Sequence, residues 1–388
     1  MTRRAVVALG AGQLVNWGVL YYAFAILLLP VEEDLGVAQW IVTGAFSLSL
    51  LVSAAVAPVV GRWCDRGLGG RAIQAGGYAA AVLLSVWALF PSLILLYVVW
   101  TGLGLCMAAA LYEPAFAVVG RAIGNPTERL RTIAAITVFG ALSSTVFLPL
   151  TAFLVRGFGW RTAVGVLAAT MAASTYSAGR FALRGVQGAS AAHLAVPVSS
   201  PPGAAQPAAV LSFRLIVVVF SVAAFANPAF TANLVPALGE RAVSPTTAAV
   251  LGGLLGIMQL PGRALVMSGR FAGAPTRLAL VSLLLQAAGF LALGVAASIP
   301  ILGAAIATFG VGAGLTTIVR PHLVQTLFGM ERAGALNGQL ARSQQIARAA
   351  GPVLMGWLGA LVGYSGAFLL LGAVMGGLAI VLERRSRR

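Results

Sequence analysis

The chain has 388 residues, of which 60% are hydrophobic and only 9% are charged. Soluble domains carry roughly a quarter charged residues and need them to cover their surface, so this composition excludes a water-soluble protein and indicates a lipid bilayer as the solvent. The formal net charge of +16 would suggest nucleic acid in a soluble protein, but here the arginines stand in gaps between apolar runs, where they set membrane topology, and no nucleic-acid partner is expected.

Twelve apolar runs are long enough to cross a membrane, since a helical span needs about 20 such residues. In chain order they cover 5–30, 38–60, 72–90, 92–119, 132–155, 161–182, 212–238, 246–268, 277–297, 299–324, 334–362 and 364–382. The eleventh is the least regular, because its first third is polar. The pattern predicts an all-α integral membrane protein with twelve transmembrane helices.

The arginines predict the orientation of these helices. With the N-terminus inside, the inside segments hold eighteen arginines, the outside segments hold three, and four lie within spans. Because positive charge concentrates on cytoplasmic segments, both termini are expected in the cytoplasm. We therefore expect a multi-pass protein of a bacterial cytoplasmic (inner) membrane.

One segment between spans six and seven differs from the rest in composition. Residues 184–211 are rich in Ala, Pro and Ser and cannot bury a core, which predicts a flexible cytoplasmic linker. This linker divides the chain into an N-terminal six-helix bundle over 1–183 and a C-terminal six-helix bundle over 212–388.

The two halves echo each other in sequence. Phe24 lies 206 positions before Phe230, and Glu113 lies 207 positions before Arg320, with a proline after each of the latter two. Similar offsets at equivalent helix positions predict two parallel repeats related by an axis along the membrane normal.

The loop between spans two and three carries a distinctive motif. Gly61 is followed four residues later by Asp65-Arg66, and then by glycines and Arg71. Gly61 would permit close helix approach, and Asp65 could pair with an arginine or cap a helix at the membrane boundary. Two interpretations stay open: a gating latch formed by Gly61, Asp65, Arg66 and Arg71, or a solvated turn that only anchors topology.

Taken together, the two six-helix halves, the central linker and this loop resemble the major facilitator superfamily of transporters. The loop departs from the family signature at Leu68, where a second glycine is usual. Tyr112-Glu113-Pro114 in span four and Gly159-Trp160-Arg161 at span six resemble the bacterial branch near the monocarboxylate and oxalate/formate carriers. The resemblance implies two pseudo-symmetric six-helix bundles, alternating access, and often an organic anion as substrate.

Two charged residues lie within spans at equivalent places. A charge in the bilayer core costs at least about 2.5–3.5 kcal/mol, so one that persists usually faces a cavity or a partner. Glu113 is the only carboxylate well inside a span, and Arg320 takes the corresponding place in span ten. The resemblance places spans one, four, seven and ten around a central cavity, which makes both residues candidates for substrate binding and Glu113 a candidate for proton coupling. The alternative is a purely structural Glu113–Arg320 salt bridge.

Other polar residues in spans one, seven and eleven complete the candidate substrate site. They are Asn16, Tyr21, Tyr22, Asn227, Gln344 and Arg348. Gln344 and Arg348 share a helix face with Asn337, and such a face must meet protein or water rather than lipid. Pro228 and Pro236 are expected to break the seventh helix and free backbone carbonyls.

The favoured function is secondary active transport of a small organic solute, coupled to protons, with an organic anion such as a monocarboxylate as substrate. The alternative is a proton-antiport exporter of an amphipathic drug-like or toxic compound, and a channel or receptor on the same fold also stays open. An enzyme is not expected, because no metal or nucleophile constellation is present. We expect a monomer with no cofactor and no metal, whose partners are the solute, the lipid bilayer and protons.

Overall fold

The structure is a computed structural model that describes residues 1–123, 126–183, 213–267, 275–328 and 330–386. Every regular element in these ranges is a helix. The linker expected over 184–211 lies outside the described residues, so the division into 1–183 and 212–388 stays a prediction.

The N-terminal helices follow the first six expected spans. They are α1 Arg3–Trp17, the π-helical segment η1 Gly18–Tyr22, α2 Ala23–Leu35, α3 Gln39–Asp65, α4 Gly69–Leu89, α5 Leu93–Ala110, α6 Tyr112–Ala122, α7 Pro126–Ala141, α8 Ser143–Ala178 and η2 Gly179–Leu183. Span one is formed by α1, η1 and α2 in succession. Span four is formed by α5 and α6, which are separated by a break at Leu111.

The C-terminal helices follow the remaining six. They are α9 Phe213–Ala232, α10 Leu234–Gly239, α11 Pro245–Met267, α12 Pro275–Val295, α13 Ile299–Phe328 and α14 Met330–Ser386. Spans eleven and twelve both lie in α14.

Within the described residues, nine helical segments are long and apolar enough to cross a membrane. Two of them, of 49 and 45 residues, each bend sharply at a glycine in the left-handed region, Gly159 with φ 78° and Gly363 with φ 71°. Counting each as two spans gives eleven, and α11 with 23 residues supplies the twelfth. The two glycines lie 204 positions apart, close to the offsets between the halves. The predicted fold of twelve transmembrane helices in two pseudo-symmetric bundles is therefore confirmed.

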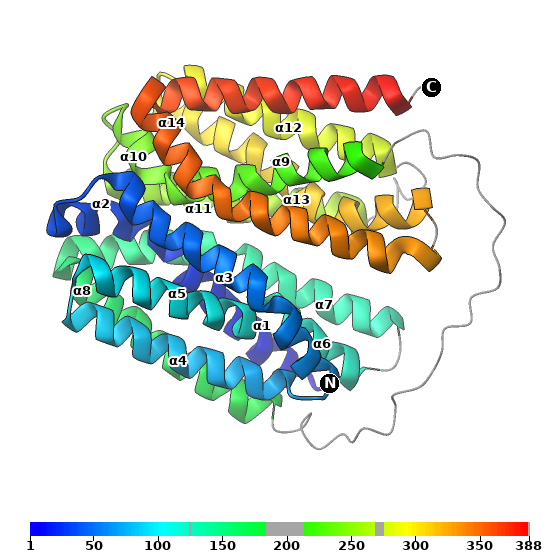
Figure 1. The fold of residues 1–388 in the computed structure, drawn as a ribbon, viewed down its shortest axis with the longest axis horizontal. Coiled ribbons are helices and arrows are strands. Elements are labelled where there is room, and N and C mark those ends of the chain that lie inside the picture. The colour runs from blue at the N-terminus through cyan, green and yellow to red at the C-terminus, as the bar shows by residue number, and fades with distance from the viewer. Residues whose placement is uncertain (124–125, 184–212, 268–274, 329, 387–388) are drawn as a thin grey trace.

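The two halves lie side by side with their helices roughly parallel (Figure 1). The N-terminal helices, coloured blue through cyan to the green of α8, form the lower half of the view, and the green-to-red C-terminal helices from α9 on form the upper half. The two marked termini lie at the end opposite to α2 and α10. The halves meet where α3 packs against α14 and where α8 packs against α11.

Each half has an aromatic core built around a repeat-related phenylalanine. In the first half, Phe24 stacks on Phe46 at 4.6 Å between ring centroids and meets Trp100 edge-on at 4.9 Å. In the second half, Phe230 meets Phe309 at 5.6 Å and Phe368 at 6.0 Å. Aromatic pairs at these distances stabilise the fold beyond the free energy gained from burial. Phe24 and Phe230, which lie 206 positions apart, therefore occupy equivalent packing centres in the two halves.

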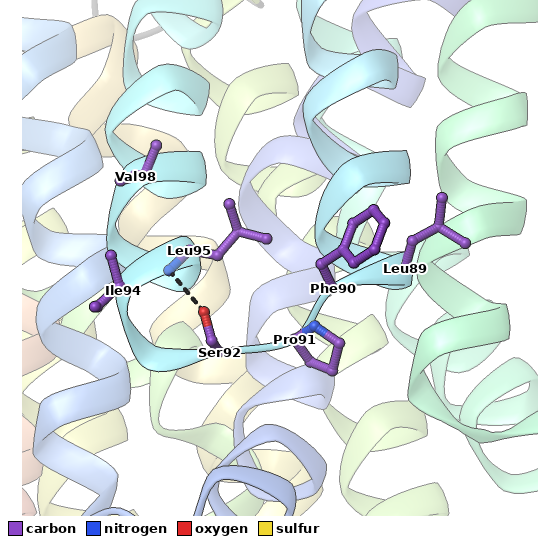
Figure 2. Close-up of a pocket in the computed structure, with 7 residues that line it drawn as sticks. All are labelled: Leu89, Phe90, Pro91, Ser92, Ile94, Leu95 and Val98. Atoms are coloured by element: carbon purple, nitrogen blue, oxygen red, sulfur yellow. Dashed lines mark hydrogen bonds between the residues drawn. The ribbon is translucent and has the colours of Figure 1, made fainter.

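Large apolar side chains also cover the outside of the bundle. Ile94 is 80% exposed and Leu89 is 70% exposed, which in water would mark a binding or aggregation surface but which suits contact with lipid. Figure 2 shows the shallow groove that these residues form at the turn between α4 and α5, where Ser92 Oγ accepts a hydrogen bond from the Leu95 amide at 3.2 Å and caps α5. Apart from Ser92 the groove is apolar, so it belongs to the lipid-facing surface.

The seventh span breaks at a different place from the one expected. Helix α9 runs through Pro228 to Ala232, and the chain leaves helical geometry at Asn233, with φ −104° and ψ 15°. A proline removes the hydrogen bond to the carbonyl four residues earlier, and for Pro236 that residue is Ala232, where α9 ends. Pro236 therefore accounts for the observed break, whereas the break expected at Pro228 is absent.

Candidate functional site

The candidate site begins with the π-helical segment in span one. Here the Ala23 amide donates to the Gly18 carbonyl, five residues earlier. A Cβ at Gly18 would lie 2.1 Å from Phe147 Cδ2, so only glycine allows this approach of α8. Such π-turns are costly and occur frequently at functional sites. The segment carries Tyr21 and Tyr22, which makes it a functional marker that sequence periodicity did not reveal.

Tyr21 is the point at which the candidate residues of the two halves meet. Its hydroxyl lies near the Thr231 side chain of α9, and the charge of Arg348 in α14 lies within electrostatic reach of it. The ring is 8% exposed and contacts Trp17 and Tyr22 edge-on at 5.4 and 5.1 Å. Tyr21 therefore contacts Tyr22 and lies within electrostatic reach of Arg348, and their role in one substrate site stays a prediction.

Asn227 belongs to the same side of α9. The Thr231 hydroxyl donates to the Asn227 carbonyl at 2.9 Å, which spans one helical turn. Residues four apart share a helix face, so Asn227, which is half-buried, lies one turn from the place where Thr231 lies near Tyr21.

Asn16 contacts the backbone of span four, and the substrate contact expected of it stays a prediction. Its side chain is buried, and its Nδ2 donates to the Ala110 carbonyl at 2.7 Å. Gln13 Nε2 donates to the same carbonyl at 2.8 Å. This carbonyl ends α5, directly before Leu111, whose ψ of −159° interrupts the helix. Both amides are thus committed to the backbone at the break in span four.

Glu113 lies in the first turn of α6, just after this break. Three neighbours on α6 show which way it faces: Ala115 packs with the α1 cluster, Ala117 packs with the cluster that contains Val60 of α3, and the Tyr112 hydroxyl donates to an α7 carbonyl at 3.3 Å. Glu113 therefore occupies the α6 face between α3 and α7, and it is exposed. Both α3 and α7 contact the C-terminal half.

Arg320 and Asn337 lie in α13 and α14, but their side chains are outside the described residues. The Glu113–Arg320 pair therefore stays a prediction. Helix α13 runs unbroken through Pro321, in contrast to the interrupted span four at the equivalent place.

Gln344 is also committed to the backbone. Its side chain is buried, and Nε2 donates to the Phe220 carbonyl of α9 at 3.1 Å, which joins spans seven and eleven. Arg348, one turn further along the same face, is exposed, with Nη1 3.5 Å from Gln345 Oε1. Of the polar stripe expected on this helix, Arg348 is exposed and Gln344 is buried, and the role of both in substrate binding stays a prediction.

The loop after α3 corrects one expectation about Gly61. A Cβ at Gly61 would meet nothing within 4 Å, because the residue lies on the exposed side of the last turns of α3, so the expected close approach is absent. Gly67, with φ 83°, turns the chain, and Gly69 packs against α6. Arg66 and Arg71 are exposed, while the side chain of Asp65 is outside the described residues, so the latch stays a prediction.

A polar contact that the sequence did not reveal joins the halves near α2 and α10. Gln39 Nε2, at the start of α3, donates to Asn233 Oδ1 at 3.3 Å and to the Tyr364 hydroxyl, which itself donates to Asn233 Oδ1 at 3.1 Å. Asn233 Nδ2 donates to the Ala229 and Pro352 carbonyls, both at 3.0 Å. We call Gln39, Asn233 and Tyr364 the inter-half triad; single polar residues at span ends carry no periodic signal that would have identified it.

Acidic residues cap the same end of both halves in related ways. Glu240 accepts from the Tyr364 amide at 2.9 and 3.0 Å, just after the bend at Gly363. Asp34, which lies 206 positions before Glu240, pairs with Arg161 at 2.9 Å. Arg241 donates to the Leu293 carbonyl at 2.6 Å, and burial lowers the pKa of this guanidinium while the adjacent Glu240 opposes that shift.

The chain consists of two six-helix repeats, with polar contacts between them and a hydrogen-bonded triad at one end. This arrangement defines a membrane transporter of the two-bundle class. Residues 9–352 match the sequence profile of the Major Facilitator Superfamily, and the chain belongs to that family. No curated protein sequence matches the chain.

Several solved structures share the fold. A bacterial homologue of the human lysosomal transporter Spinster, in its inward-facing and occupied conformation, is similar with a TM-score of 0.73 at 13% identity, over 98% of this chain and 96% of that one. The same homologue, inward-facing and unoccupied, gives 0.70 at 14% identity over 98% and 94%. The human organic anion transporter TETRAN gives 0.69 at 17% identity over 98% and 99%.

Proposed function

We propose that this transporter carries a small organic anion such as a monocarboxylate, coupled to protons, by alternating access. The observation that carries the proposal is the place where Tyr21 of span one, in ring contact with Trp17, lies near Thr231 of span seven and within electrostatic reach of Arg348 of span eleven; we call this place the junction. It joins hydroxyl groups and a guanidinium from both halves at one place. A solute bound there would contact both halves at once, which alternating access requires.

The junction has the chemistry that a carboxylate needs. A guanidinium binds a carboxylate through two parallel hydrogen bonds, and Arg348 is exposed. The buried indole nitrogen of Trp17 has no hydrogen-bond partner among the described residues, and its ring contacts Tyr21. We propose that Trp17 donates to the solute and that the rings of Trp17 and Tyr21 contact its apolar part.

Glu113 is the proposed proton carrier. It is exposed on the face of α6 between α3 and α7, and Tyr112 beside it contacts Trp17 at 4.9 Å between ring centroids. We propose that Glu113 and Arg348, from opposite halves, both act at this aromatic cluster. A carboxylate placed there can take up a proton when the anion binds, which lowers the charge that crosses the membrane.

The inter-half triad supports an alternating-access cycle. It closes the end of the molecule opposite the two termini, and we propose that this is the periplasmic end of a monomer in a bacterial inner membrane, with both termini cytoplasmic. The state captured here is then closed to the outside.

The aromatic cluster also favours a second candidate. Tyr21, Trp17, Tyr112 and Phe116 contact one another in succession, Glu113 follows Tyr112 in sequence, and aromatic faces with a nearby carboxylate attract organic cations. A proton-antiport exporter of an amphipathic cation would use this part of the site.

Uptake into proteoliposomes distinguishes the proton-coupled anion transporter from the exporter of an amphipathic cation. Benzoate and lactate serve as anionic probes and tetraphenylphosphonium as the cationic probe, each with and without an inward proton gradient. We expect benzoate accumulation that a protonophore abolishes, loss of it in Arg348→Gln, and partial retention in Arg348→Lys, which keeps the charge but not the guanidinium fork. Arg156→Gln, at an exposed outer position, is the matched control. Transport of the cation alone would overturn the anion assignment.

A further inference from the structure

We propose that Gln13 and Asn16 are positioning residues, which hold the interrupted fourth span in the conformation that places Glu113 on the exposed face of α6 between α3 and α7. The inference rests on the proposed role of Glu113 in proton coupling. It links that carboxylate to α1, and so to the helix that continues into the Tyr21 segment.

The break has a chemical cause in the sequence. In an unbroken helix the Ala110 carbonyl would accept from the amide of residue 114, but residue 114 is a proline and has no N–H. The chain leaves helical geometry at Leu111, between these two residues. The carbonyl is then without its helical donor inside a membrane span, where water cannot replace it.

Two side-chain amides replace the missing donor. Gln13 Nε2 lies 2.8 Å and Asn16 Nδ2 lies 2.7 Å from the Ala110 oxygen, and Gln13 also reaches the Leu111 oxygen at 3.4 Å. Gln13 is 0% and Asn16 is 4% exposed. Two buried amides on one carbonyl oxygen use both of its lone pairs, which fixes the end of α5 against α1.

The other half shows that proline alone does not make the break. Pro321 lies 207 positions after Pro114, yet α13 is continuous through it. At the 206-residue offset, the positions equivalent to Gln13 and Asn16 are Val219 and Val222, which offer no donor. The half that has the amide pair therefore has an interrupted helix before its proline, whereas the half that lacks the pair has a continuous helix.

The break sets the direction of Glu113. Because Leu111 interrupts the helix, α6 does not continue the helical rotation of α5, and its orientation depends on its own packing against α3, α4 and α7. These contacts leave Glu113 on the exposed face between α3 and α7. If the amide pair is lost, α6 is expected to rotate or to become continuous with α5, and the side chain at 113 then leaves this face.

Thiol labelling of the full-length protein in proteoliposomes measures this direction without a substrate. Glu113→Cys is placed in a Cys64→Ala, Cys106→Ala background and labelled with a membrane-impermeant methanethiosulfonate. We expect labelling to slow several-fold when Gln13→Met and Asn16→Leu are added, since both keep the side-chain size but remove the donor. Asn16→Leu alone leaves the Gln13 bond in place and serves if the pair does not fold.

Two further variants separate positioning from stability. Gln286→Met removes a buried amide of α12 that bonds Ser282 and Thr316, and should lower the melting temperature without slowing labelling at 113. Pro114→Ala, added to the amide variants, returns the missing N–H and should restore the melting temperature but not the labelling rate. Unchanged labelling in the amide variants, or equal slowing by Gln286→Met, would overturn the inference.

The pH profile of benzoate uptake supplies the second readout. Asn16→Leu should shift this profile when Glu113 is present and leave it unmoved in a Glu113→Gln background. If Glu113→Gln alone leaves the profile unchanged while labelling still depends on the amide pair, the positioning stands and the proton-coupling proposal fails.

Discussion

Gln39 and Tyr364 lie in opposite halves of the chain, and the amide of Gln39 donates a hydrogen bond to the hydroxyl of Tyr364. The Tyr364 side of this contact is already assembled within the C-terminal half, through Asn233 and the Glu240 carboxylate. Gln39 is the member of the inter-half triad that the N-terminal half contributes. Separation of the halves at this end therefore has to break the hydrogen bonds of the Gln39 side chain.

Removal of this side chain should open the closed end. Gln39→Ala loses two hydrogen bonds between the halves, each worth about 0.5–1.5 kcal/mol, so the population open at this end should rise several-fold. Double electron–electron resonance between labels on the α2–α3 and α10–α11 turns, which lie at the triad end of the two halves, would show a longer distance component. Ser92→Ala, which removes a cap within one half at the same end, is the control. An unchanged distance distribution in Gln39→Ala would contradict the assignment of the triad.

The second contact between the halves depends on Gly256. A Cβ there would lie 2.3 Å from the Ala141 carbonyl, which is backbone and cannot move aside. Gly256→Ala should destabilise the protein by about 1–3 kcal/mol through overpacking and reduce transport. Gly165→Ala, where a Cβ meets nothing within 4 Å, should be neutral or stabilising by up to about 1 kcal/mol. Thermal unfolding in detergent, followed by tryptophan fluorescence, compares the two directly.

The π-helical segment of span one should require Gly18. Gly18→Ala places a methyl group 2.1 Å from the Phe147 ring, and we expect loss of benzoate uptake together with about 1–3 kcal/mol of stability. Phe147→Leu in the same chain should recover part of both. Gly12→Ala on α1 would meet only Ala178 Cβ at 3.6 Å and should leave uptake intact. Full activity of Gly18→Ala would show that the π-turn is dispensable.

Neutralising the carboxylate of span four should uncouple transport from protons. Glu113→Gln keeps the shape of the side chain but cannot exchange a proton, so uptake should continue down a gradient and lose its dependence on pH. Expression and melting temperature should stay close to those of the parent, because Glu113 is exposed. The measurement is initial uptake of benzoate across a range of external pH, and an unchanged profile would remove Glu113 from the mechanism.

The amino-acid sequence determined the class of fold without further help. Apolar runs of span length and the 206-residue echo between Phe24 and Phe230 specify helices, their number and their arrangement in two repeats, because a bilayer allows few other ways to satisfy the backbone. Prolines also gave local information: Pro114 and Pro236 each mark a helix that ends four residues earlier.

The identity of the site residues depended on tertiary contacts. The sequence does not distinguish Asn16, Gln344 and Arg348, which are all polar residues within spans. In the structure, Asn16 and Gln344 donate hydrogen bonds to backbone carbonyls, whereas Arg348 is exposed and lies within electrostatic reach of Tyr21. Helical periodicity places a side chain on a face but does not say which groups of another helix lie opposite. The number of spans follows from the cost of burying backbone in lipid, which is local, whereas the partner of each polar side chain follows from packing between segments more than 90 residues apart, which only the folded chain decides.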